Sequence, residues 1–215
     1  MQIKLVRHGQ SMANVGLVDA AAVGDHAIEL TDTGHAQARA TGAQLGRDYL
    51  HDALIYTSPF RRARDTLTGV LDGAGLARGR ITVYEDPRLR EVEHGYADVP
   101  AQDAMRRTHG WFYYRFHGGE SPADCYDRTS GFLESLMRQA QRKQAECVLV
   151  VTHGLTIRCF VMRFLHLSVE QFATLANPDN GAIITLAPRA QIAEPLFAAG
   201  RWAVGGLRLR DAPQG

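Results

Sequence analysis

Runs of apolar residues recur along the chain, and stretches with helical spacing separate them. Residues 2–6 form a short apolar run with one lysine, and residues 147–152 (CVLVVT) form the strongest run of all. Continuous apolar runs of this length are typical of strands that are buried on both faces. Further strands are predicted at residues 53–57, 81–84, 181–186 and 202–209.

Segments with helical patterns lie between these predicted strands. Residues 35–47 carry Ala and Gln at helix-compatible spacing, and Thr31 or Thr33 is placed to cap this helix. Ser168 and Gln171 form a capping box for a short helix. Further helices are predicted at residues 58–71 (opened by Ser58-Pro59), 123–141 and 155–165. Strands that alternate with helices predict an α/β fold, with a mostly parallel sheet covered on both faces.

The alternation fails between about residues 95 and 130. This segment contains HGWFYYRFHGGESPADCYDR, which is aromatic, basic and glycine-bearing. We expect it to form a small cap inserted over the edge of the sheet. Because the chain has 215 residues and no internal repeat, residues 1–215 are predicted to form a single domain with this insertion.

The composition excludes some classes of function. The formal net charge of +1 gives no electrostatic basis for binding nucleic acid or an acidic membrane surface. No apolar run approaches the roughly 20 residues that span a bilayer, and the first residues lack a signal-peptide pattern. Cys125, Cys147 and Cys159 have no CxxC spacing and are predicted to be buried, reduced thiols. We therefore expect a soluble, cytoplasmic protein.

Two of the predicted strands end in the same unusual way. Arg7-His8-Gly9 follows the first strand, and Thr152-His153-Gly154 contains the end of the strongest one. Ligands of α/β sheets bind beyond the carboxyl ends of strands, so neighbouring strands would bring both imidazoles to one pocket. Either histidine alone is equally well explained as a core residue at a turn. Two at matching strand ends, one of them preceded by Arg7, favour a functional site.

The second and third strands lead to further charged residues. Arg61, Arg62 and Arg64 stand in the first turn of a predicted helix, where cations are unfavourable unless an anion binds there. One of them is expected to clamp a phosphate, and the others to be solvated. The third strand leads to Glu91 and Glu93. Repulsion by a bound anion favours the protonated carboxyl that a general acid needs, and either glutamate fits this role.

Together these residue types indicate phosphoryl transfer through a histidine nucleophile. A neutral imidazole attacks phosphorus, arginines and the second histidine neutralise the phosphoryl oxygens, and a carboxylic acid protonates the leaving alcohol. The chain contains neither a GxxxxGK[ST] nor an HExxH motif, and it has no carboxylate cluster. We therefore expect catalysis without a metal ion or another cofactor.

The chain resembles the histidine phosphatase superfamily, which has the phosphoglycerate mutase-like fold, a three-layer α/β/α sandwich. Five blocks match in order over nearly the whole length: LVRHGQSMAN, LTDTGHAQA, TSPFRRARDT, LREVEHG and VTHG. The resemblance implies that His8 is the nucleophile, and it selects Arg62 over Arg61 and Glu91 over Glu93. It also implies that the catalytic or phosphate-binding residues are Arg7, His8, Gln10, Ser11, Asn14, Arg62, Glu91, His153 and Gly154.

The cap carries a more specific resemblance. FYYRFHGGESPADCYDR and NPDNGAI are similar to broad-range acid phosphatases and plant phosphoglycerate mutase-like proteins. That similarity implies that the GES turn, residues 119–121, stands near the substrate. Pro59 and Asp65 depart from the family pattern, as do residues 94–98 after the acid, so substrate contacts at residues 94–98 are not inferred.

We expect a phosphatase that hydrolyses small phosphorylated metabolites. A phosphoglycerate mutase with the same phosphohistidine is the alternative within this chemistry. A non-catalytic module that binds phosphate or a phosphoprotein is the alternative of another class. The aromatic side chains of the cap either pack into the core or hold part of the substrate, and its arginines are either solvated or contact the substrate. The sequence predicts no particular oligomeric state.

Overall fold

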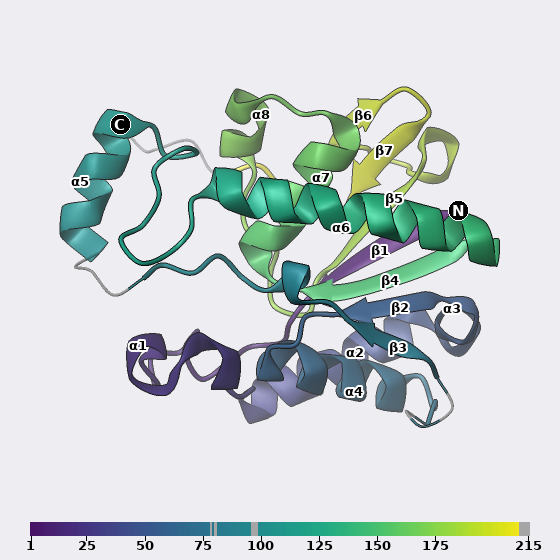
Figure 1. Cartoon of the computed structure of the whole chain (residues 1–215). Helices are drawn as coiled ribbons and strands as arrows, with labels where there is room; N and C mark the ends of the chain where they lie inside the picture. The colour runs from purple at the N-terminus through teal and green to yellow at the C-terminus, as the bar shows by residue number, and fades with distance from the viewer. Residues whose placement is uncertain (78, 80, 96–98, 211–215) are drawn as a thin grey trace.

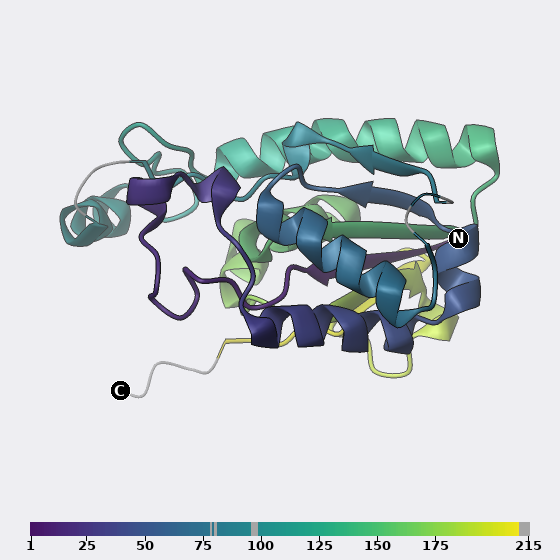
Figure 2. The same ribbon diagram turned by 90° about the horizontal axis from the view of Figure 1, so that it is seen from below.

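The computed structural model shows a seven-stranded sheet between two layers of helices (Figure 1 and Figure 2), and it describes residues 1–77, 79, 81–95 and 99–210. The strands are β1 (Gln2–Arg7), β2 (Leu54–Thr57), β3 (Val83–Glu85), β4 (Cys147–Thr152), β5 (Ile183–Pro188), β6 (Phe197–Ala199) and β7 (Trp202–Gly205). The α-helices are α1 (Ala20–Val23), α2 (Asp32–Leu45), α3 (Arg47–Asp52), α4 (Arg61–Gly73), α5 (Val99–His109), α6 (Pro122–Lys143), α7 (Gly154–Leu165) and α8 (Val169–Thr174). Short 3-10 turns are η1 (Asp25–Ala27), η3 (Pro87–Leu89) and η4 (Arg189–Gln191).

The sheet is mixed, with strand order β3-β2-β4-β1-β5-β7-β6. The pairs β3–β2, β2–β4 and β4–β1 are parallel, whereas β1–β5, β5–β7 and β7–β6 are antiparallel. The predicted α/β class is confirmed, and the parallel arrangement holds for the half of the sheet that carries the predicted site. The connections that join β5, β6 and β7 are too short for the crossover that parallel strands need, whereas β5 itself follows the longer segment with α7 and α8 and runs against β1.

Alternating side chains of the central strands divide the interior into two cores. On one face, Ile3 and Leu5 of β1 pack with residues of α6, α7 and α8, including Phe132 and Phe160. On the other face, Val6 and residues of β2 and β4 pack with α2 and α4. Figure 1 shows these helix layers above and below the sheet, as the predicted three-layer sandwich requires.

Several element boundaries differ from the predictions for physical reasons. Thr31, not Thr33, caps α2, since its hydroxyl accepts from the backbone of Gly34. Ser58-Pro59 does not open α4, which begins at Arg61, because the backbone of Phe60, with a φ of −66° and a ψ of 138°, is still extended. The last predicted strand ends early, at Gly205, because Gly206 has a φ of 86°. The strand β6 was not predicted.

The predicted cap and cysteines need smaller corrections. Part of the cap, α5, is helical, and Figure 1 shows it beyond the carboxyl ends of the parallel strands; residues 96–98 of the cap lie outside the described part of the chain. The division into one domain with an insertion stays a prediction. Cys125 and Cys159 are buried as expected, but Cys147 is partly exposed because β4 begins at the rim of the sheet.

Candidate active site

Two histidines lie side by side at the carboxyl edge of the sheet. Arg7 and Thr152 are register partners in the parallel pair β1–β4, so His8 and His153 leave the sheet together. Their ring centroids lie 5.1 Å apart in an edge-to-face arrangement. His8 is 4% exposed and His153 is fully buried. The structure therefore places both strand-end histidines in one site.

Close backbone packing fixes the loop that carries His8. A Cβ atom at Gly9 would lie 2.4 Å from the carbonyl oxygen of Gly34, and a Cβ at Gly34 would lie 2.1 Å from that of Gln10. Only glycine allows the loop and the start of α2 to approach this closely. The backbone N–H of Gly9 also donates to the hydroxyl of Thr66 on α4 at 2.9 Å. The loop is thus fixed by contacts with two helices of the same layer.

The imidazole of His8 is held as a neutral base. Its Nδ1 lies 2.7 Å from the carbonyl oxygen of Gly9, and only a protonated nitrogen can donate to a carbonyl. The neutral ring then carries its lone pair on Nε2. Burial, with a further contribution from the positive charge of Arg62, lowers the pKa of His8 from 6.5 to about 3. At neutral pH, His8 therefore has an unprotonated nitrogen that can act as a nucleophile.

His153 is also uncharged, and Ser58 orients it. Its Nε2 lies 2.8 Å from the Ser58 hydroxyl, and the ring of Phe60 packs edge-on with centroids 5.3 Å apart. Burial, followed by the charge of Arg62, lowers the pKa of His153 well below 6.5. Within the described chain, no partner is present for its buried Nδ1. The lowered pKa argues against the positive charge expected of His153, which leaves Arg7 and Arg62 as the cations of the site.

Arg7 lies at the end of β1 and faces the start of α7. Its Nη1 donates to the carbonyl oxygen of Pro178 at 2.6 Å, whereas its Nε is buried without a partner among the described residues. A Cβ atom at Gly154 would lie 3.5 Å from this Nε and 3.2 Å from the side-chain amide carbon of Asn177. Burial lowers the pKa of Arg7, and the negative charge of Glu91 partly offsets this effect. Gly154 thus leaves the space around the free Nε unobstructed.

Of the three arginines at the start of α4, Arg62 is the buried one. Its Nη1 donates to the carbonyl oxygen of Asp25 at 2.5 Å and lies 2.8 Å from Oδ1, and its Nη2 donates to Oδ2 at 3.1 Å. Arg61 instead pairs with Glu29 at 2.5 Å and its side chain is 49% exposed, while Arg64 is also exposed. The geometry therefore agrees with Arg62, and not Arg61, as the candidate phosphate clamp.

The carboxylate of Glu91 is fixed at the N-terminus of α7. Its Oε2 accepts from the backbone N–H of Leu155 at 3.1 Å, and its Oε1 accepts from the N–H and the hydroxyl of Thr156, each at 3.2 Å. A helix N-terminus stabilises a negative charge in this position. Glu93 is more exposed and lacks such contacts among the described residues. Both glutamates line a cavity of about 240 Å³ together with Arg62.

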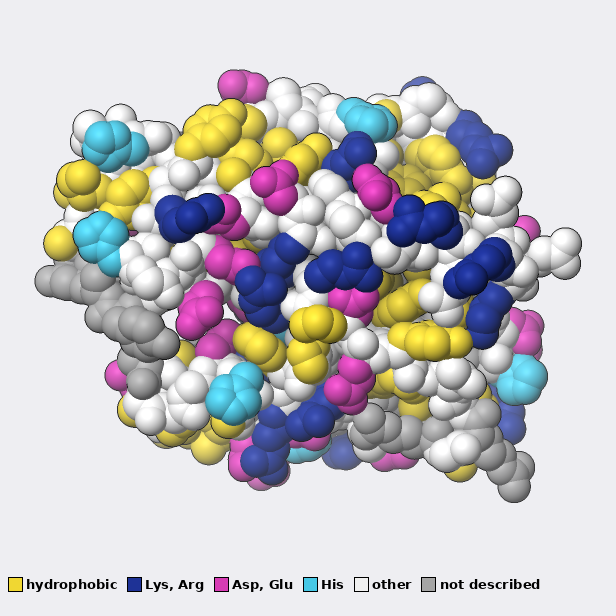
Figure 3. Space-filling model, viewed as in Figure 1, with side chains coloured by type: hydrophobic (Ala, Val, Ile, Leu, Met, Phe, Trp, Pro, Cys, Tyr) yellow, Lys and Arg dark blue, Asp and Glu magenta, His cyan; other side chains and the backbone are white. Residues whose placement is uncertain are grey.

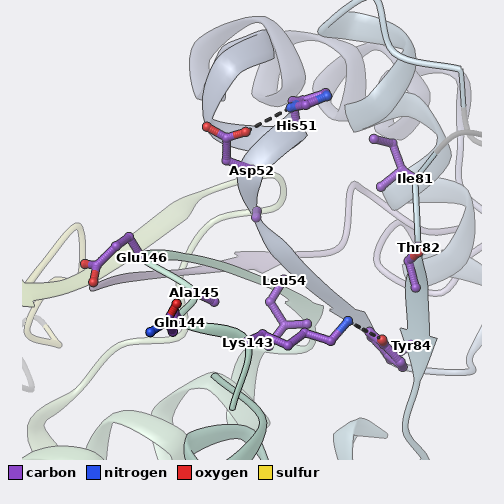
Figure 4. A pocket seen from close by; sticks show the side chains of 11 residues that line it. His51, Asp52, Leu54, Ile81, Thr82, Tyr84, Lys143, Gln144, Ala145 and Glu146 are labelled. Atoms are coloured by element: carbon purple, nitrogen blue, oxygen red, sulfur yellow. Dashed lines mark hydrogen bonds and ion pairs between the residues drawn. The ribbon is translucent and has the colours of Figure 1, made fainter. Parts of the chain in front are cut away.

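A larger cavity, of about 480 Å³, lies at the opposite edge of the sheet (Figure 4). It is formed by the segments that precede β2, β3 and β4, at the amino ends of the parallel strands. The ammonium group of Lys143 donates to the Tyr84 hydroxyl at 2.9 Å, and His51 contacts Asp52 at 2.9 Å. Because none of the strand-end histidines or arginines lines this cavity, the candidate chemistry belongs to the carboxyl edge.

Side chains of the loop after His8 mainly bind one another. Oε1 of Gln10 accepts from the Thr31 hydroxyl at 2.8 Å. The N–H of Ser11 donates to Oδ1 of Asn14 at 3.0 Å, and the N–H of Asn14 donates to the Ser11 hydroxyl at 3.3 Å. Asn180, from the segment before β5, donates to the same Oδ1 at 3.1 Å. These residues shape the loop, and their contact with phosphate stays a prediction.

The GES turn, residues 119–121, supports the wall of the pocket from behind. The N–H of Glu120 donates to the carbonyl oxygen of Glu93 at 2.8 Å. The carboxylate of Glu120 accepts from Nε of Arg128 at 3.1 Å and also pairs with Arg90. None of the three residues of the turn lines the cavity that holds Arg62 and Glu91. The cavity is not lined by His8 or His153 either, so the expected position of this turn near the substrate stays a prediction.

Several residues that contact the site were not predicted, among them Ser58, Thr66 and Asp25. Ser58 stands at the carboxyl end of β2, so the rule that locates His8 and His153 could have identified it. Thr66 lies four residues after Arg62 and therefore on the same side of α4. Asp25 lies in a segment without periodicity, and no sequence signal pointed to it.

The described residues contain no group of three or more His, Cys, Asp or Glu side chains arranged to hold a metal ion. In the same part of the chain, no helix combines the length and the apolar character needed to cross a membrane. Metal-independent catalysis stays a prediction that activity measurements must test.

Comparisons with known proteins agree with this geometry. The chain is 38% identical over 201 residues to Phosphoglycerate mutase-like protein AT74 of Arabidopsis thaliana, with 85% of this chain and 63% of the relative covered. The match thus spans less than two thirds of that relative's length. It is 27% identical over 281 residues to Broad-range acid phosphatase DET1 of Saccharomyces cerevisiae, with 86% and 84% covered. The resemblance of the chain to these two groups is confirmed.

A solved structure of mycobacterial glucosyl-3-phosphoglycerate phosphatase Rv2419c, in complex with VO3, has a similar fold. The TM-score is 0.72 at 27% identity, and the match covers 95% of this chain and 97% of the other. The model of the histidine phosphatase superfamily (branch 1) matches residues 3–194. With the two histidines, the buried arginine and the glycine-dependent loop in one site, this match shows that the chain belongs to the histidine phosphatase superfamily, branch 1.

Proposed function

We propose that this protein is a metal-independent phosphatase that hydrolyses small phosphomonoesters through a phosphohistidine on His8. The observation that carries the proposal is the state of His8, which is neutral, hydrogen-bonded through Nδ1 and close to Arg62. A phosphate dianion next to Arg7 and Arg62 would meet the Nε2 lone pair directly. Relatives named as phosphatases and as mutases both support phosphoryl chemistry on a small molecule.

The proposed reaction has two steps. Nε2 of His8 forms a bond to phosphorus while the bond from phosphorus to the ester oxygen breaks, and Glu91 gives its proton to the leaving alcohol. Arg7, Arg62 and His153 bind the three non-bridging oxygens. Glu91 then accepts a proton from water, whose oxygen attacks phosphorus and displaces His8. Phosphate leaves, and Glu91 and His8 return to their starting states.

Residues around these groups keep the reaction geometry. Gln10, Ser11 and Asn14 hold the loop that follows His8, and Gly154 keeps the space around Nε of Arg7 open. Ser58 orients His153. The protein makes these contacts by itself, so they preorganise the site for a bound phosphate.

Trapping the covalent intermediate tests the proposal. Labelled substrate followed by an alkaline quench should give a phosphoprotein that is stable in base and labile in acid. His8→Ala should lose both the label and turnover of p-nitrophenyl phosphate, while the matched His51→Ala variant, far from the site, should keep both. Full turnover by His8→Ala would exclude the mechanism. Tight phosphate binding without any turnover by the unaltered protein would identify the non-catalytic module instead.

A separate assay distinguishes the phosphatase from a mutase. The segment between Glu91 and His153 must provide the cap, the long helix α6 and the approach to β4, so little chain remains for a lid that excludes water. With 3-phosphoglycerate and bisphosphoglycerate, we expect release of inorganic phosphate to exceed formation of 2-phosphoglycerate. An enolase-coupled assay beside a phosphate-release assay measures both. Isomerisation faster than release would make the mutase the better assignment.

A further inference from the structure

The pocket next to the proposed phosphate site is acidic. Asp25 and Glu93 line the cavity of about 240 Å³ beside Glu91, the proposed acid, and Arg62 lines it as well. Asp25 already pairs with Arg62 through both carboxylate oxygens, so this carboxylate offsets the arginine's charge. Figure 3 shows acidic side chains gathered on this face of the molecule, between α5 and α1. The part of a substrate that extends beyond the phosphate would therefore enter a negative field.

The arginines of the cap do not reverse this field. Arg90 and Arg128 both pair with Glu120, and Arg106 pairs with Asp103 at 2.8 Å. Arg115 pairs with Asp124 as well. Arg107 lies apart from the pocket, in a hollow formed with Trp111. A second anionic group on the substrate would have to compete with these carboxylates for an arginine.

Glu93 is the carboxylate best placed to contact this part of the substrate. It is exposed, and no hydrogen bond or ion pair joins its carboxylate to another described residue. Its backbone, in contrast, is held firmly. Its carbonyl oxygen accepts from Glu120, and a Cβ atom at Gly119 would lie 2.2 Å from that oxygen. A fixed backbone thus presents an unpaired negative charge at the wall of the pocket.

We propose that Glu93 is a specificity-determining residue that selects phosphomonoesters whose alcohol carries an ammonium group and disfavours those with a second anion. This inference rests on the proposed phosphatase function, because it concerns the leaving group at the same site. The carboxylate of Glu93 attracts an ammonium group, with Asp25 adding to the negative field, and both repel a carboxylate or a second phosphate.

A series of small phosphomonoesters that differ in the charge beyond the phosphate tests the proposal. The matched set is 2-aminoethyl phosphate, ethyl phosphate and 2-phosphoglycolate, which carry a cation, no charge and an anion beyond the phosphate. We expect kcat/KM to fall in this order. For Glu93→Gln, the ratio between the first and last substrates should shrink about three- to tenfold, as expected for loss of one partly screened charge. Glu134→Gln, on the exposed side of α6, should leave the ratio unchanged.

Two further measurements separate the possible failures. p-Nitrophenyl phosphate tests the phosphatase itself, so its hydrolysis with no charge preference, or with a preference for 2-phosphoglycolate, would overturn the inference and leave the function standing. If no substrate is turned over, the dissociation constants of 2-aminoethyl phosphate and 2-phosphoglycolate still measure the preference. High salt should weaken the preference more in the unaltered protein than in Glu93→Gln, and salt-independent selectivity would assign the preference to shape rather than charge.

Discussion

Acidification should destabilise this protein through the buried imidazole of His8. The folded protein holds a proton on both ring nitrogens of His8 only near pH 3, whereas the unfolded chain does so near pH 6.5. Between these values the unfolded state binds more protons, so the free energy of unfolding falls as the pH is lowered. A single group of this kind contributes about 1.4 kcal/mol per pH unit, or about 2 kcal/mol between pH 7 and pH 5.

This loss is large compared with the roughly 5–15 kcal/mol by which a typical domain is stable. Urea unfolding at several pH values, followed through the fluorescence of Trp111 and Trp202, measures it. His8→Asn removes the imidazole and keeps an amide that can donate to the Gly9 carbonyl, so its stability should fall less steeply with acid. Acidic residues titrate alike in both proteins and cancel in the comparison.

The comparison between the two proteins tests whether folding lowers the pKa of His8. The difference in unfolding free energy between the unaltered protein and His8→Asn should change by about 2 kcal/mol between pH 7 and pH 5. The matched His51→Asn, whose side chain is 68% exposed, should run parallel to the unaltered protein. Parallel curves for His8→Asn would mean that His8 titrates alike in the folded and unfolded states, and a neutral nucleophile could no longer be inferred from its burial.

Three other changes test the site. Glu91→Gln should slow esters with poor leaving groups by about 10²–10⁴-fold but aryl phosphates far less, measured as kcat/KM, and equal losses would reduce Glu91 to a positioning role. Gly9→Ala should cost about 1–3 kcal/mol of unfolding free energy, because the added Cβ would lie 2.4 Å from the Gly34 carbonyl oxygen; unchanged stability would contradict the close packing of the loop. EDTA should leave turnover intact while vanadate inhibits, and activity restored to chelated protein by a divalent ion would refute metal independence.

The central strands of the sheet could be predicted because buried strands require continuous runs of apolar residues. The run of residues 147–152 reads as a buried strand because both of its faces contact helices, and β4 has those bounds. The edge of the sheet carries a weaker pattern. The strand β6 was missed because it has only three residues and none of them is fully buried. The antiparallel half could not be predicted from local patterns, since strand direction depends on how the connections fold back.

The site was predictable to the extent that it follows strand ends. His8 and His153 follow β1 and β4 directly, so one topological rule locates both. The choice of Arg62 over Arg61 needed the family resemblance, because adjacent arginines have the same charge and only the face of α4 distinguishes them. The partner of Arg62, Asp25, lies in an irregular segment, and its contact depends on tertiary folding alone.

The antiparallel direction of β5 determines when the site can be completed during synthesis. Because β5 runs against β1, it begins at the edge where β1 and β4 end, and the segment before it reaches the histidines. Pro178 accepts from Arg7, and Asn180 donates to the carbonyl oxygen of His8 at 3.0 Å. These contacts join residues more than 170 positions apart, which makes them late events in folding. A nascent chain that has not yet reached residue 178 leaves the end of β1 without these partners, so the ribosome must add more than 170 residues after Arg7 before the nucleophile is set in place.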